Sequence, residues 1–124
     1  PATDASVPAL RDIDSEFYQK FAEIVGKEMA NPNLNVDAIA AELGISRVQM
    51  YRKLKALTNY SPTDLVRIMR LQRAATMLKT SRATVAEICF AVGFTSHSYF
   101  TKCYHEYFGE SPSESQHRTS KLSE

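Results

Sequence analysis

Basic side chains are concentrated in the middle of this 124-residue chain. Residues 47–79 carry eight lysines and arginines and one acid, Asp64, whereas residues 1–30 carry three basic and six acidic side chains. Because the formal net charge is only +1, the local excess is more informative than the total. An excess that spans two predicted helices is better explained by a polyanionic partner than by a solvated basic face.

A helix predicted from Arg47 to Leu57 places polar groups where they could contact such a partner. Met50, Leu54 and Leu57 share one face, which must be the buried side. At ~100° per residue, the outward face and its flanks hold four candidates for contact with DNA bases: Val48, Gln49, Tyr51 and Arg52.

The chemistry of these side chains suits the edges of base pairs. Arg52 can pair bidentately with guanine, and Val48 can pack against a thymine methyl group. Both lie in the N-terminal half of the helix, the part that recognition helices present to bases. Tyr51 could equally pack against a neighbouring helix.

A second helix, predicted over residues 97–108, has the same design with fewer charges. Its buried face is predicted to hold Phe100, Tyr104 and Tyr107. The candidates for base contact lie on the outward face and beside it: His97, Ser98, Thr101 and Lys102. We expect weaker contacts here, made mostly by hydrogen bonds.

Candidates for phosphate contact are basic side chains along the first helix and the hydroxyl residues that begin helices. They are Ser46, Arg47, Lys53, Lys55, Thr84 and Ser96. Free N–H groups at a helix start suit a phosphate. The hydroxyl groups would cap any helix, however, and so discriminate little.

The elements that must position these groups are helices with clear start and stop signals. Apolar periodicity and capping residues predict helices over residues 14–30, 36–43, 47–57, 62–79, 85–92 and 97–108. Ser46 with Gln49, and Thr84 with Glu87, have the spacing of capping boxes. Ser111-Pro112 repeats the cap signature of Ser61-Pro62, so a further helix is expected there.

An internal repeat relates the two halves of the chain. Residues 39–45 match residues 88–94 at an offset of 49, and residues 50–64 match residues 100–114 at an offset of 50. Each copy is a short helix, a turn containing Gly44 or Gly93, and a second helix, which is the helix-turn-helix plan. The small Ala40 and Cys89 would let the second helix cross closely.

The predicted fold is therefore all-α, with two helix-turn-helix units joined by a long linking helix. We expect a linker over residues 1–12, the first helix and first unit over 13–60, the linking helix over 61–80, the second unit and terminal helix over 81–116, and a loose tail over 117–124.

Other classes of function find little support. No nucleophile–base pair, paired carboxylates or glycine-rich phosphate loop indicates an enzyme. Cys89 and Cys103 lack metal-site spacing, so no metal or cofactor is expected, and reduced thiols suit a cytoplasmic setting. No apolar stretch approaches the ~18 residues of a membrane span, so no membrane contact is expected.

The segments Ile88–Phe94, Phe108–Glu114 and Met50–Thr58 resemble the AraC/XylS family of bacterial transcription regulators, over about residues 36–114. The resemblance implies seven helices, with one helix of each unit in the major groove. It implies base contacts at Val48, Tyr51, Arg52, His97, Ser98 and Lys102. Residues 50–58 look most like the version at the C-terminus of hybrid two-component sensor-regulators.

The sequence departs from the family at two places. Asn59 stands where glycine is usual, although asparagine also tolerates positive φ. Ser115 to Arg118 replaces an aromatic residue followed by a basic one, which leaves the packing of the last helix open.

Double-stranded DNA with two boxes about one helical turn apart is the expected partner, and RNA polymerase is a further candidate. If the chain is such an output domain, dimerisation lies in other parts of a parent protein. The alternatives are a helical protein-interaction module that has lost DNA binding, and a non-specific DNA binder, against which the low total charge argues.

Overall fold

The structure is a computed structural model that describes residues 12–122, with side chains described for residues 14–118. The described residues form helices and no strand, which confirms the predicted all-α class and the number of helices. The seven helices are α1 (Asp12–Glu28), α2 (Val36–Leu43), α3 (Arg47–Thr58), α4 (Pro62–Thr80), α5 (Val85–Ala91), α6 (His97–Phe108) and α7 (Pro112–Leu122).

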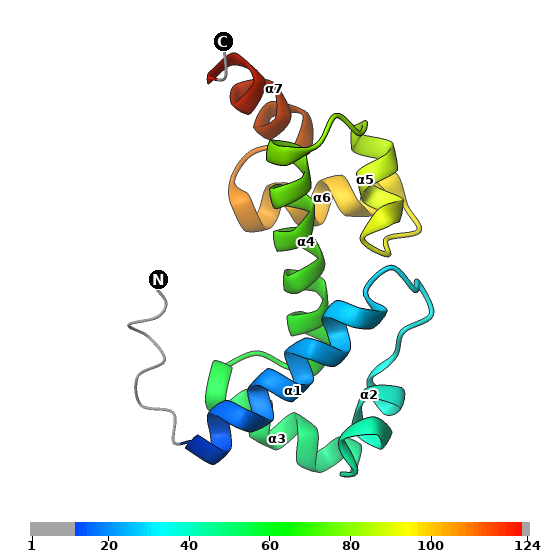
Figure 1. Cartoon of the computed structure of the whole chain (residues 1–124), viewed down its shortest axis with the longest axis vertical. Coiled ribbons are helices and arrows are strands. Elements are labelled where there is room, and N and C mark those ends of the chain that lie inside the picture. Colours follow the sequence, from blue (N-terminus) through cyan, green and yellow to red (C-terminus); the bar gives the residue numbers. More distant parts are fainter. Residues whose placement is uncertain (1–11, 123–124) are drawn as a thin grey trace.

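Helix α4 is the axis of the molecule. It runs along the long dimension, with α1–α3 gathered around its first turns and α5–α7 around its last turns (Figure 1). We call these groups the first half and the second half. Helices α3 and α6 run in roughly the same direction, and each begins on the side where α2 and α5 lie.

The predicted caps of the helices from α2 to α6 begin them as expected. Ser46 accepts a hydrogen bond from Gln49 N–H, and Thr84 accepts one from Glu87 N–H, each at 3.1 Å. The Gln49 and Glu87 side chains accept in return from the N–H of the cap residue, which completes both capping boxes. The side chains of Asn35, Ser61 and Ser96 each accept a hydrogen bond from a backbone N–H at the starts of α2, α4 and α6. Local sequence signals therefore set these helix starts.

The helix ends differ from expectation in a few places. Helix α1 spans Asp12–Glu28 rather than 14–30, and α5 stops at Ala91, with Val92 as its C-cap. Most of the expected N-terminal linker lies outside the described residues. Helix α7 continues to Leu122, beyond the expected boundary at residue 116.

Polar contacts explain how the last helix packs without an aromatic residue. The buried Ser115 hydroxyl accepts a hydrogen bond from the Tyr104 hydroxyl at 2.9 Å and donates to Glu110. Glu110 also pairs with Arg118, while Gln116 donates to the carbonyl of Ala83 at 2.9 Å. These contacts attach α7 to α6 and to the loop before α5.

One continuous core fills the interior of both halves. Apolar residues at helical spacing supply most of it, including Phe21, Val25, Met50, Leu54, Leu65, Leu71, Leu78, Phe100 and Tyr104. Ala40 and Cys89 are buried at the helix crossings, as predicted. The prediction for Tyr107 is wrong, because its ring is 42% exposed, with its hydroxyl 3.4 Å from Gln72 Nε2. Cys103, one turn before Tyr107, is buried beside Phe100 and Tyr104.

The two turn glycines share a left-handed backbone but not their surroundings. Gly44 has φ 73°, and a Cβ atom there would meet no described atom within 4 Å. Gly93 has φ 99°, and a Cβ atom there would lie 2.2 Å from the Met29 carbonyl oxygen and 2.8 Å from Arg70 Nε. Gly44 is needed for conformation alone, whereas Gly93 is also needed for space.

Alanine substitutions should separate these two requirements. We expect Gly44→Ala to lower the free energy of unfolding by about 1 kcal/mol, the cost of a left-handed alanine. Gly93→Ala should cost at least about 2 kcal/mol, because overpacking is added to that strain. Urea unfolding of both variants measures the difference, and equal losses would contradict the close packing at Gly93.

Candidate nucleic-acid interface

Helix α3, the predicted recognition helix of the first unit, is held by its buried side. Met50 and Leu54 have no exposed surface, and this fixes the rotation of the helix. Val48 and Tyr51 are consequently 57% and 46% exposed. Arg52 is exposed beside them. These three predicted side chains therefore share one outward surface near the start of the helix.

Gln49 lies at the same helix start but is partly engaged. Its side-chain oxygen accepts a hydrogen bond from Ser46 N–H at 3.1 Å. The side-chain NH2 group is then the part of Gln49 suited to contact a base acceptor. The capping box thus orients Gln49 as well as starting the helix.

Helix α6, the predicted recognition helix of the second unit, is fixed in the same way by Phe100 and Tyr104, which are buried. His97, Ser98 and Lys102 are exposed on its outward side. Thr101 is only half-exposed, and its hydroxyl donates to the His97 carbonyl at 3.0 Å. The structure therefore brings three of the four predicted residues to the surface and turns the Thr101 hydroxyl back onto the helix.

The predicted basic phosphate contacts fall into different environments. Arg47 is exposed and lies 3.5 Å from Asp37 across the turn. Lys55 donates to the Asn59 carbonyl at the end of α3, at 3.2 Å. Lys53 lies over the Phe17 ring of α1, with its ammonium 4.9 Å from the ring centre. The structure does not bring Lys53 to the surface that holds Val48 and Arg52.

The predicted hydroxyl contacts all act as caps, which the sequence could not distinguish from phosphate binding. Ser46 and Ser96 are exposed at the starts of α3 and α6, and the Ser96 hydroxyl lies 3.4 Å from that of Ser98. Thr84 differs, because the Glu87 carboxylate accepts from its N–H at 2.8 Å. A carboxylate at that position disfavours a phosphate at the start of α5.

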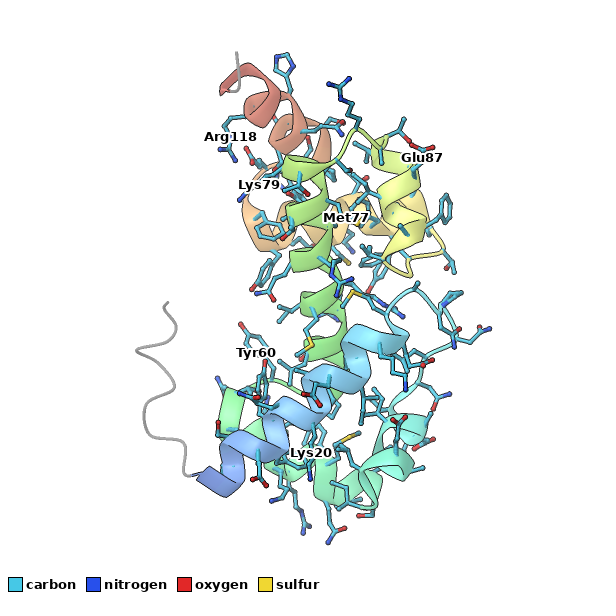
Figure 2. The ribbon with its side chains drawn as sticks, viewed as in Figure 1. Lys20, Tyr60, Met77, Lys79, Glu87 and Arg118 are labelled. Carbon is cyan, nitrogen blue, oxygen red and sulfur yellow. The ribbon has the colours of Figure 1, made fainter. Side chains whose placement is uncertain are left out.

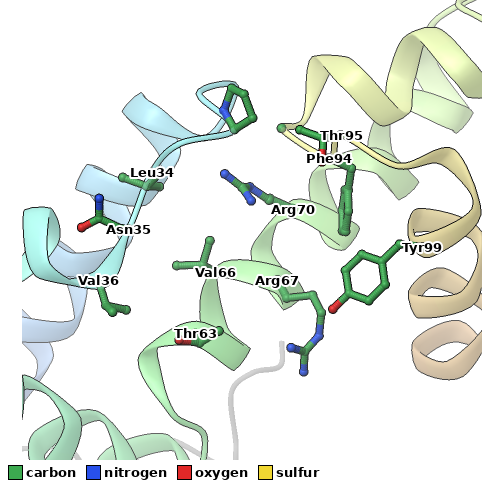
Figure 3. A pocket seen from close by; sticks show the side chains of 12 residues that line it. Leu34, Asn35, Val36, Thr63, Val66, Arg67, Arg70, Phe94, Thr95 and Tyr99 are labelled. Atoms are coloured by element: carbon green, nitrogen blue, oxygen red, sulfur yellow. The ribbon is translucent and has the colours of Figure 1, made fainter.

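A hollow of about 390 Å³ lies between the two helix-turn-helix units. The loop before α2, the side of α4 and the turn before α6 line it, as Figure 3 shows. Arg67 and Arg70 of α4 project into this region, and Tyr99 faces them from α6. The ring of Tyr99 is 50% exposed. The outward face predicted from the sequence omits Tyr99. Its position directly after Ser98, on the border between the exposed and buried faces of the helix, could have indicated that its side chain is partly exposed.

The arginines of α4 hold local partners. Arg67 donates to the Asp64 carboxylate at 2.9 Å, and Arg70 donates to the Asn31 carbonyl at 2.9 Å. The hydrogen bond from Arg67 lowers the pKa of the Asp64 carboxyl. Partial burial opposes a raised pKa for Arg67, but the bond and charge of Asp64 outweigh it. This pair is a fixed polar feature near the start of α4.

The described part of the chain contains neither a candidate metal site nor a candidate membrane-spanning helix. Among its residues, no group of three or more His, Cys, Asp or Glu side chains could hold a metal ion. No helix within residues 12–122 is long and apolar enough to cross a membrane.

Residues 39–118 match the family described as helix-turn-helix domain. The chain is 39% identical over 112 residues to Histidine kinase P4 of Formosa agariphila, covering 90% of this chain and 8% of that protein. It is 35% identical over 95 residues to the HTH-type transcriptional regulator GbdR of Pseudomonas aeruginosa, covering 75% of this chain and 26% of GbdR. The chain thus spans only a small part of these relatives.

Solved structures share the fold. A transcriptional regulator of Chromobacterium violaceum, described as containing an AraC-type DNA-binding domain, superposes with a TM-score of 0.81 at 24% identity, covering 88% of this chain and 96% of that one. The DNA-binding domain of AdpA, solved in complex with a target DNA, superposes with a TM-score of 0.74 at 22% identity, covering 82% and 90%.

The Asp64–Arg67 pair should make stability depend on pH in a defined direction. The pKa of Asp64 is lowered in the folded chain, so its carboxylate stabilises the fold above the ordinary value of about 4. That stabilisation is lost as the pH falls through the folded-state pKa. We expect Asp64→Asn to cost less than about 1 kcal/mol at pH 7, because the pair is one-third exposed.

Urea unfolding of both proteins between about pH 3 and pH 7 tests this expectation, because the linkage is confined to acid pH. The difference between wild type and Asp64→Asn should shrink below about pH 4. A difference that stayed constant over the whole range would contradict the pairing. Arg67→Ala is the matched variant, since it removes the partner and leaves the carboxyl.

Proposed function

The chain belongs to the AraC-type helix-turn-helix family of DNA-binding domains of transcription regulators, and from this we propose that it recognises specific double-stranded DNA with both α3 and α6. One observation carries the proposal. Both helices bury one side in a shared core and present an exposed N-terminal half on the same side of α4 (Figure 1). Two helices held in this way can enter neighbouring stretches of major groove.

The exposed side chains suggest a division of roles along α3. Arg52 would pair bidentately with guanine, while Val48 would pack on a thymine methyl group. Tyr51 and the NH2 group of Gln49 would contact the flanking bases. Arg47 and Lys55 would contact phosphates, as would the start of the helix at Ser46.

The contacts of α6 would be weaker. Lys102 is the one basic side chain among the proposed base contacts there, with His97 and Ser98 beside it. Thr101 would contribute mainly its methyl group, because its hydroxyl is bonded to the helix backbone. The start of α6, at Ser96, would bind a phosphate of the DNA backbone.

The operator that fits this arrangement has two boxes about one helical turn (~10 base pairs) apart. Helix α4 would set that separation. If the duplex has to bend to reach both helices, the deformation would cost a few kcal/mol, on the order of 1–6.

The wider role proposed is that of an output domain in a larger signalling protein. The match to a small part of a protein named as a histidine kinase supports this role. Signal reception and dimerisation would then lie in other parts of the parent. AdpA supports the choice of DNA as partner, since that domain was solved on its target DNA.

Selection of duplexes from a random library, with the 124-residue chain at moderate salt, tests the proposal directly. Two short motifs separated by about one turn, roughly 10 base pairs, would support it. A single motif would limit base recognition to α3. No enrichment at any salt concentration would reject sequence-specific binding by this chain and favour a protein-interaction module.

Arg52→Ala is the sharpest single substitution. We expect it to weaken operator binding by about 1–3 kcal/mol and to relax preference at one base position. Lys102→Ala should cost less. Arg73→Ala is the matched control, because Arg73 is an exposed arginine on α4 near Gly26 of α1. Unchanged affinity and preference in Arg52→Ala, measured by titration and repeated selection, would reject α3 as a base reader.

Arg47→Ala should act on all duplexes alike. Loss of one phosphate contact is expected to lower the slope of log affinity against log salt by about 1, with sequence preference unchanged. The salt slope of Lys53→Ala is the comparison for that of Arg47→Ala, because the Lys53 ammonium group lies over the Phe17 ring of α1 rather than on the surface that holds Val48 and Arg52. A salt slope that Arg47→Ala left unchanged would remove Arg47 from the phosphate contacts.

A further inference from the structure

The two halves of the molecule meet at a second place besides α4. The turn between α5 and α6 lies against the end of α1, and Gly93 is the point of contact. A Cβ atom on Gly93 would lie 2.2 Å from the Met29 carbonyl oxygen and 2.9 Å from Arg70 Cζ. The backbone of the second helix-turn-helix unit therefore rests directly on the last carbonyls after α1 and on a guanidinium group.

Arg70 is built into this junction. It leaves α4 in the direction of the loop after α1 and the turn that carries Phe94 (Figure 3). Its Nη2 donates to the Asn31 carbonyl at 2.9 Å, across 39 residues of sequence. Its Nε atom is buried and is the one buried side-chain nitrogen or oxygen found without a hydrogen-bond partner in the described residues.

A charged guanidinium group at this place costs free energy that an apolar side chain packed there would not cost. Burial lowers the pKa of Arg70, which shows that the charged form is disfavoured by lost solvation. The Asn31 carbonyl, in the loop after α1, compensates in part because it accepts a hydrogen bond from the charged group at 2.9 Å. A side chain of this length and charge is therefore suited to clamp the α1 end, α4 and the Gly93 turn together.

We infer that Arg70 is a positioning residue that fixes the placement of α6 relative to α3, and thereby the separation of the two DNA boxes that the chain accepts. A single linking helix can bend, and it leaves the two halves attached along one line. The contacts of Arg70 and Gly93 join the two halves at a second place, beside α4 rather than along it. This inference rests on the proposed bipartite DNA recognition.

The role differs from that of a DNA contact or of a general stabiliser. If Arg70 acts only through position, each helix should still bind its own box when Arg70 is changed. What should be lost is the preference for one length of the DNA spacer between the two boxes. Spacer preference is therefore the decisive measurement, and affinity for one box is the internal control.

The experiment uses the 124-residue chain and duplexes that carry the two selected boxes. The spacer is varied by one and two base pairs in each direction, and the α6 box is scrambled in a further duplex. We expect wild type to prefer one spacer over a two-base-pair change by about tenfold or more, since a misplaced box must be reached by deforming DNA or protein. Arg70→Ala should reduce this preference to within about threefold and change one-box affinity less than about twofold.

Two further variants make the result interpretable. Arg70→Lys keeps a donor for the Asn31 carbonyl but not the fork, so it should restore part of the spacer preference. It also guards against a folding defect in Arg70→Ala, which circular dichroism and urea unfolding would reveal. Arg73→Ala, one turn further along α4, should leave spacer preference as in wild type.

The outcomes separate the two proposals. If wild type discriminates spacers and folded Arg70→Ala and Arg70→Lys discriminate equally well, the positioning role is wrong, while bipartite recognition stands. If Arg70→Ala loses affinity for the one-box duplex as much as for the two-box duplex, Arg70 is a contact or a stabiliser and the inference again fails. If wild type binds no duplex specifically, the proposed function itself fails.

Discussion

The arrangement of the whole molecule depends on the packing of α4 through both of its halves. Buried side chains on several sides of this helix, including Leu65, Leu71, Ala74 and Leu78, join one continuous core. Figure 2 shows side chains from both halves gathered along it. Because α2–α3 and α5–α6 pack against opposite ends of the same helix, α4 is the main element that places α3 and α6 relative to one another.

The two helix-turn-helix units follow one plan but differ in what surrounds them. Each has a capped first helix, a small buried residue at the crossing and a glycine in the turn. The first turn, at Gly44, is open on its outer side, whereas the second turn, at Gly93, is covered by the end of α1 and by Arg70. The two copies therefore differ in environment, because the end of α1 and Arg70 cover the turn of the second copy and not that of the first. The more basic surface also lies on the first unit.

Polar groups complete the structure where apolar packing ends. The bond between Tyr104 and Ser115, extended through Glu110 to Arg118, attaches α7 to α6. Such a network can replace an aromatic contact because each buried polar group in it has a partner. The Asp64–Arg67 pair plays a similar part at the start of α4. These networks hold α7 and the start of α4 in place.

Patterns in the amino-acid sequence were enough to predict the helices, the caps from α2 onward, the duplication and the outward faces of α3 and α6. These features depend on residues three or four positions apart, such as Ser46 with Gln49, so local spacing is enough to predict them. Packing and hydrogen bonding in the folded chain set which outward groups are available, as the hydroxyl of Thr101 and the ammonium of Lys53 show. They also set the exposure of Tyr107 and bring Met29, Arg70 and Gly93 together. Those contacts join residues far apart in sequence, and no local pattern encodes the angle at which α4 brings them together.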